Sequence, residues 1–138
     1  MTAAFRYIGK KRRAKEDSRF VAGHGRFAAD IALPLMKHVA LITSPYPCAR
    51  IMAIRADKAL ALPGCACVLA GEELSAATDP LLVGVDAPLV RRYPLANGIA
   101  RYAGEWVAAV VGDTRAAAED AAERVEIDYQ PLDRKSVV

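Results

Sequence analysis

The chain has 138 residues, of which 54% are hydrophobic and 7% aromatic, so it can bury the core of one domain built mainly from Ala, Val, Leu and Ile. No apolar run approaches the roughly 18 residues of a membrane-spanning helix, and the basic residues that follow Met1 are not backed by the apolar stretch of a signal peptide. The net charge of +3 is modest, and we expect a cytoplasmic protein.

Residues 1–37 are predicted to form an extended, loop-rich segment that holds most of the basic excess. The cluster Lys10–Arg13 could contact phosphates, which would make the chain an independent basic binding module. Glu16 and Asp17 interrupt the basic run, and no aromatic residues interleave with it to stack on bases. An exposed loop or short helix over Lys10–Arg19 is therefore favoured, and the binding module is kept as the alternative.

The segment Gly23–Ala28 fits GxGxxA, a pattern found where a dinucleotide binds at a helix N-terminus. That site needs a long helix after the glycines, but Pro34 closes the next segment within a few residues. The glycines are thus predicted to form tight turns. His24 has no second histidine or cysteine nearby, so a solvated side chain is favoured over a metal ligand.

The middle of the chain is predicted to contain short strands and short helices. The expected strands are His38–Thr43, Ala49–Arg55 and Cys65–Leu69. The expected helical segments are Ala56–Leu62, ended by Pro63 and Gly64, and one turn at Gly71–Leu74. Prolines and glycines then punctuate 75–97, which predicts a long connection with at most short strands such as Leu81–Val85.

The last third of the chain predicts a strand, a helix and a second strand. Trp106–Val111 is an unbroken apolar run, as in a strand covered on both faces. Asp113 or Thr114 can cap a helix over Arg115–Arg124, whose alanines form one packing stripe. Val125–Tyr129 alternates apolar and polar residues and predicts a half-exposed strand. This βαβ-like unit leaves open whether its two strands are adjacent or parallel.

Few residues are candidates for a catalytic or metal-binding role. Ser44 precedes two turn prolines and has no identifiable base, so a turn serine is favoured over a nucleophile. Glu105 beside Trp106 could be a tuned acid, but we favour a structural role in which Trp106 fills a gap and Glu105 pairs with an arginine such as Arg101. The cysteines form no CxxC pair, which argues against a disulfide framework or a zinc or iron–sulfur site, and small core residues are expected at Cys48, Cys65 and Cys67.

Short motifs in a fixed order along nearly the whole chain resemble one family. They are Gly23–Phe27, Leu33–Pro34, Ser44–Pro45, Gly71–Glu72, Arg101–Glu105, Val107–Val111, Ala117–Ala122 and Val125–Leu132. The series resembles the amino-terminal region of the large, molybdopterin-binding subunit of the xanthine dehydrogenase and aldehyde oxidase family, which includes aerobic carbon monoxide dehydrogenases. The chain departs from the family at Pro47–Cys48, where an Ala-His pair is usual, and it ends at Val138 where the family continues.

The resemblance implies an α+β fold of the α/β hammerhead type, with a mixed sheet, a short helix and one amphipathic helix packed on it. We expect a single domain over 1–138 with its sheet-and-helix core at 38–132. The resemblance also implies an oxidoreductase that hydroxylates a carbon centre or oxidises carbon monoxide at a molybdenum–pterin centre. Electrons would pass through [2Fe–2S] clusters to FAD on other subunits or domains.

In that family the pterin-binding loops and the catalytic glutamate lie beyond this region. We therefore assign no catalytic, cofactor-binding or metal-binding residue to the chain, and expect a structural domain. Its expected partners are the remainder of the molybdopterin-binding subunit and the iron–sulfur and FAD subunits or domains, with no membrane and no nucleic acid. A small stand-alone enzyme that uses Glu105 is a third hypothesis.

Overall fold

The computed structural model describes residues 7–81 and 92–133. The chain divides into two compact units, with the boundary between Pro34 and Leu35. The first unit contains a short helix α1 (Asp17–Val21) and a 3-10 helix η1 (Ala28–Asp30), and no residue of either is buried. The other described residues of this unit lie in turns and irregular structure. The single-domain organisation stays a prediction.

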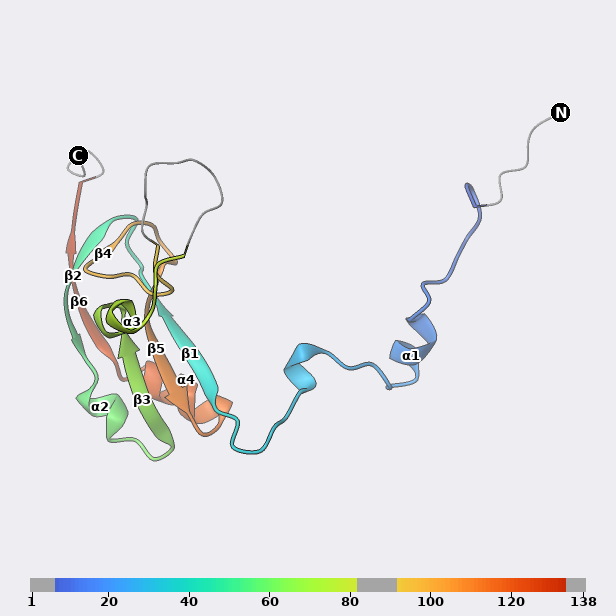
Figure 1. Ribbon diagram of the computed structural model, residues 1–138, viewed down its shortest axis with the longest axis horizontal. Helices are drawn as coiled ribbons and strands as arrows, with labels where there is room; N and C mark the ends of the chain where they lie inside the picture. The colour runs from blue at the N-terminus through green and yellow to red at the C-terminus, as the bar shows by residue number, and fades with distance from the viewer. Residues whose placement is uncertain (1–6, 82–91, 134–138) are drawn as a thin grey trace. The chain divides into compact units, whose positions relative to one another are not determined.

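The second unit contains two three-stranded sheets (Figure 1). The first, sheet A, has β5 (Trp106–Gly112) between β1 (His38–Thr43) and β3 (Cys65–Ala70). The second, sheet B, has β2 (Ala49–Arg55) between β4 (Ile99–Ala100) and β6 (Glu126–Pro131). All of these pairings are antiparallel.

Three helices accompany the sheets, namely α2 (Asp57–Leu60), α3 (Gly71–Ala77) and α4 (Arg115–Ala122). None of the described helices is long and apolar enough to cross a membrane. Helix α4 packs on β1 and β5. Its first turn is capped as predicted, because the Thr114 hydroxyl accepts a hydrogen bond of 3.1 Å from the Ala117 N–H. Gly112 permits the close approach of helix and strand, since a Cβ there would lie 2.6 Å from the backbone nitrogen of Ala118.

Among the described residues, two small core clusters lie on either side of β5. Beneath α4, Val110 packs with Ala59 and Ala121. Near the start of β5, Val107 packs with Ala96 and Ala100 and with inward-facing residues of sheet B. These sheet B residues are Ile51, Ile54, Ile127 and Tyr129. The central strand β5, which consists mainly of small and branched residues, thus contributes a side chain to each cluster.

The α+β class is confirmed, although the mixed sheet of the prediction is divided into two antiparallel sheets. The strands on either side of α4 are neither adjacent nor parallel, because β5 lies in sheet A and β6 in sheet B. Their composition explains the separation: β5 is apolar throughout and suits a central position, whereas β6 has one charged face that must stay in water.

Other differences concern the short elements. Helix α3 runs for two turns where one was predicted, and β4 was not predicted. Leu81 forms an isolated antiparallel bridge with Arg92, and the rest of the predicted strand Leu81–Val85 lies outside the described residues.

Candidate functional site

Glu105 lies where the chain turns into β5, and backbone hydrogen bonds fix its position. Gly104 has a φ of +89°, a left-handed conformation that favours glycine. The Gly104 N–H donates to the Ser44 carbonyl at 2.8 Å, and the Ser44 N–H donates to the Glu105 carbonyl at 2.9 Å. The loop before β5 is therefore tied to the end of β1.

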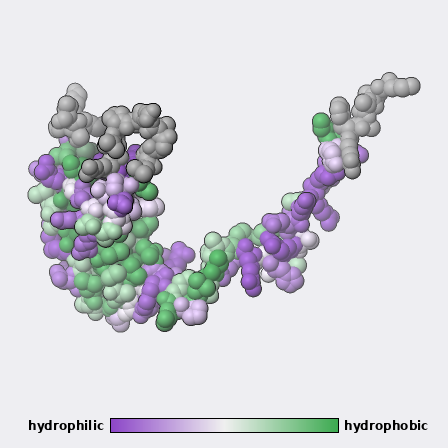
Figure 2. Space-filling view, viewed as in Figure 1, coloured by the Kyte–Doolittle hydropathy of each residue, from purple (hydrophilic) through white to green (hydrophobic). Residues whose placement is uncertain are grey.

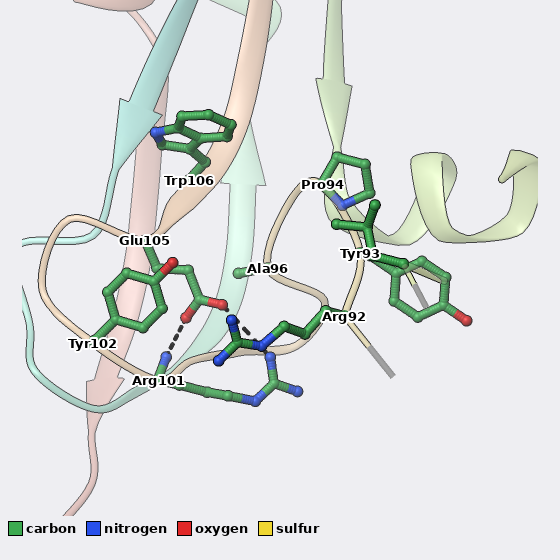
Figure 3. A pocket seen from close by; sticks show the side chains of 9 residues that line it. Arg92, Tyr93, Pro94, Ala96, Arg101, Tyr102, Glu105 and Trp106 are labelled. Carbon is green, nitrogen blue, oxygen red and sulfur yellow. Dashed lines mark hydrogen bonds and ion pairs between the residues drawn. The ribbon is translucent and has the colours of Figure 1, made fainter. Parts of the chain in front are cut away.

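The Glu105 carboxylate turns back on the same loop. It accepts a hydrogen bond from the Arg101 backbone N–H and forms an ion pair of 3.5 Å with the Arg101 guanidinium (Figure 3). Its side chain is only 13% exposed, so this charge is largely withdrawn from water and compensated within the loop. The predicted pairing of Glu105 with Arg101 is confirmed.

A cavity of about 260 Å³ opens beside this carboxylate. Its walls combine two arginines, three aromatic rings and the Glu105 side chain (Figure 3). The arginines are Arg92 and Arg101, and the rings are those of Tyr93, Tyr102 and Trp106. The prediction that Trp106 fills a gap was wrong, because this side chain is 50% exposed and forms part of the cavity wall instead.

Helix α4 covers one face of sheet A, and we call the opposite face of this sheet the open face. The register places Val39 and Cys67 opposite Val111, and Leu41 and Leu69 opposite Ala109, so these residues share that face. Val39 is 59% exposed and Leu41 is 43% exposed. Figure 2 shows hydrophobic residues gathered over β1 and β3 on the side turned to the viewer. The apolar surface that this face exposes to solvent is therefore concentrated on β1, at Val39 and Leu41, beside the half-buried Leu69 and Val111.

The outer face of sheet B has the opposite character. Arg55 binds Asp128 through two hydrogen bonds of 2.5 and 2.8 Å and also contacts Glu126, which pairs with Lys58 as well. Hydrogen bonding to Arg55 lowers the pKa of Asp128, and hydrogen bonding to Lys58 and Arg55 lowers the pKa of Glu126. This face is a solvated network of paired charges.

Tyr129 points inward from β6, and its ring lies 5.3 Å from that of Tyr46. Its hydroxyl is buried and has no hydrogen-bond partner among the described residues. Desolvation, followed by the neighbouring Tyr46, raises the pKa of Tyr129. Burial of this hydroxyl without a partner lowers the stability of the fold, and we assign it no functional role.

The remaining candidate residues from the sequence lie in a turn, in the core or at the surface. The Ser44 hydroxyl is buried and bonds with the backbone of Tyr46 at 3.1 Å, as expected of a turn serine. His24 is exposed. Cys48 is buried, whereas Cys65 and Cys67 are half-buried, so only the first is a full core residue. Within residues 7–81 and 92–133, no three His, Cys, Asp or Glu side chains gather as a metal site would require.

Comparison with known proteins gives consistent matches along the chain. Residues 22–133 match the family model described as "Aldehyde oxidase and xanthine dehydrogenase, a/b hammerhead domain". The carbon monoxide dehydrogenase large chain of Afipia carboxidovorans is 38% identical over 91% of this chain, which corresponds to 15% of that relative.

Solved structures agree with these sequence matches. Quinoline 2-oxidoreductase from Pseudomonas putida 86 superposes with a TM-score of 0.78 at 38% identity, covering 86% of this chain and 16% of that one. A Cu,Mo-CO dehydrogenase superposes with a TM-score of 0.72 at 34% identity, covering 90% of this chain and 15% of that one. The chain therefore spans about one sixth of the length of its relatives. It belongs to the aldehyde oxidase and xanthine dehydrogenase family, as an a/b hammerhead domain.

Proposed function

We propose that this chain is the amino-terminal structural domain of a molybdenum hydroxylase large subunit and that it contributes no catalytic residue of its own. The observation that carries the proposal is the match of nearly the whole chain to one small part of much longer oxidoreductase chains. Its task is then to dock against the remainder of that subunit. The complete enzyme would use molybdenum–pterin, with [2Fe–2S] clusters and FAD on partner subunits or domains.

The open face supports a docking role. Val39 and Leu41 stay exposed, although most residues of the neighbouring strand β5 are buried. Burial of such a face against another polypeptide would gain about 25 cal/mol for each Å² removed from water. A partner with an apolar surface is therefore the occupant that this face favours.

The cavity beside Glu105 does not fit the implied cofactor. Its volume of about 260 Å³ is below the roughly 300 Å³ at which sites for drug-sized ligands begin, and a pterin that carries a metal and a phosphate is larger. The Glu105 oxygens are also occupied by the Arg101 N–H and guanidinium.

The same contacts favour a structural role for Glu105 over the hypothesis of a small stand-alone enzyme. A general base needs a lone pair directed at its substrate, whereas this carboxylate closes a turn. In the assembled enzyme, Glu105→Gln should leave turnover unchanged, because the amide oxygen can still accept from the Arg101 N–H. A large loss of turnover with unchanged assembly would contradict the structural role.

The docking proposal can be tested with the Afipia carboxidovorans large chain from which the part matching this chain is removed, here called the truncated large chain. It is first shown to bind its own removed segment. This chain should then bind it in a measurable complex. Failure to bind, with that positive control intact, would overturn the proposal.

Two matched variants locate the contact. Leu41→Asp on the open face should weaken binding at least about tenfold, because the contact would bury an unpaired charge. Met52→Asp introduces the same charge at a position of sheet B that is 59% exposed, and it should bind like the parent chain. Loss of binding by Met52→Asp alone would place the contact on sheet B and contradict a role for the open face.

A further inference from the structure

Residues 7–34, which we call the N-terminal arm, bury little side-chain surface within their own unit. Gly25 is half-buried and every other residue of the arm is exposed. The large apolar side chains left in water are Tyr7, Ile8, Phe20, Val21, Phe27, Ile31 and Leu33. A segment gains stable order only when burial of apolar surface offsets the loss of conformational entropy. The arm lacks that burial.

The arm nevertheless contains one preformed element. The rings of Phe20 and Phe27 stack with centroids 5.3 Å apart, and Gly25 fits against the Phe20 ring, since a Cβ there would lie 2.3 Å from one of its carbons. Asp17 and Asp30 each accept a backbone N–H three residues earlier, both at 2.9 Å. The two stacked rings form an exposed aromatic cluster, which we call the Phe20–Phe27 pair.

The matches to relatives extend into the arm. The family model begins at residue 22, yet the Afipia carboxidovorans large chain matches 91% of this chain. The unmatched remainder is too short to account for all of the residues before 22. Part of the arm before residue 22 is therefore shared with a large chain of which the match covers only 15%.

The charges of the arm indicate what kind of surface it fits. The basic residues outnumber the acidic ones, as Lys10, Lys11, Arg12, Arg13, Lys15, Arg19 and Arg26 stand against Glu16, Asp17 and Asp30. Large apolar side chains flank the basic run Lys10–Arg19 on both sides, at Ile8 before it and from Phe20 onward after it. A nucleic acid backbone would satisfy the charges but would leave Ile8, Val21 and Ile31 in water. A protein surface with apolar pockets and acidic rims satisfies both.

We propose that the N-terminal arm is a docking segment that becomes ordered on the remainder of the large subunit, with the Phe20–Phe27 pair as its anchor. This inference rests on the function proposed above and names a contact separate from the open face. The arm folds as it binds, so contacts with the partner surface offset the entropy lost when it becomes ordered.

Hydrogen exchange of the full chain, alone and bound to the truncated large chain, tests the arm directly. In the free chain the backbone amides of residues 7–34 should exchange at nearly unprotected rates. In the complex their exchange should slow at least about tenfold, with the strongest protection around Phe20 and Phe27. The double variant Phe20→Ala, Phe27→Ala should weaken binding at least about tenfold. Leu60→Ala, which removes a side chain that is 51% exposed on α2, is the matched control and should bind normally.

The outcomes separate this inference from the function on which it rests. A complex that forms while the arm stays unprotected would overturn the arm proposal and leave the docking function standing. No complex would overturn both. Protection of the arm in the free chain would mean that its partner is this chain itself, which contradicts the proposal. Protection by duplex DNA at low salt, but not by the truncated large chain, would favour the basic binding module instead.

Discussion

Replacing Gly71 by alanine should destabilise the folded unit, even though alanine is the better helix former. Gly71 is the first residue of α3, where alanine would be favoured by at most about 1 kcal/mol. A Cβ at this position would lie 1.9 Å from the carbonyl oxygen of Ala96 and 2.6 Å from its carbonyl carbon. Because these are backbone atoms, they cannot rotate away as the end of a side chain could.

The segment that would have to move is itself anchored. The Ala96 N–H donates to the Trp106 carbonyl at 2.7 Å, so a shift of Ala96 pulls on the start of β5. Overpacking of this kind costs about 1–3 kcal/mol, and we expect a net loss of about 2 kcal/mol. For a folded unit of roughly 100 residues this lowers the Tm by about 8–16 °C.

Thermal and urea unfolding followed by circular dichroism would measure this loss. Glu72→Ala is the matched control, since it places alanine at the next, exposed position of α3 and should change stability by less than about 0.5 kcal/mol. A Tm for Gly71→Ala equal to or above that of the parent chain would refute the reasoning. It would mean that helix propensity outweighs the close approach of α3 to Ala96.

Three further predictions concern single contacts. Thr114→Ala should lower the free energy of unfolding by about 1 kcal/mol because the helix cap is lost, which the urea midpoint would measure. Thr114→Ser should keep most of the stabilisation that the cap provides. Tyr129→Phe should leave stability unchanged or raise it, because it removes a buried hydroxyl without a partner, and a clear loss in the same assay would reveal a missed hydrogen bond. Arg55→Met should destabilise at pH 7 but much less at about pH 2. Its carboxylate partners have lowered pKa values, so their contribution is present above about pH 4 and is lost as pH falls through the folded-state values. An equal cost at both pH values in acid-dependent thermal unfolding would point to packing instead of charge.

Local patterns in the sequence predict α4 and the main strands well. The cap at Thr114 and the alanine stripe that includes Ala118 and Ala121 depend only on residues within one helix, and both are confirmed. The pairing of Glu105 with Arg101 was also predictable, because the two residues are four apart in one loop. Short-range contacts of this kind leave their signature in the order of residues.

Features that depend on distant partners were not predictable in the same way. The separation into two sheets depends on pairings such as Val39 with Val111, and β4 has only two residues and so carries no periodic signal. The open face was missed because an apolar run such as His38–Thr43 reads the same whether one face or both are covered. Trp106 was misjudged for the same reason, since nothing local distinguishes a buried indole from one that lines a cavity.

The order of strands in sheet A has a consequence for biosynthesis. Its middle strand, β5, is made last, after both β1 and β3 have left the ribosome without a neighbour to bond with. Until residue 112 emerges, the backbone N–H and C=O groups of β1 and β3 have no β5 to pair with. Such unpaired strands can form hydrogen bonds with other polypeptides and aggregate. We therefore expect its yield in cells to depend on holding chaperones and on how quickly translation runs from β3 to β5.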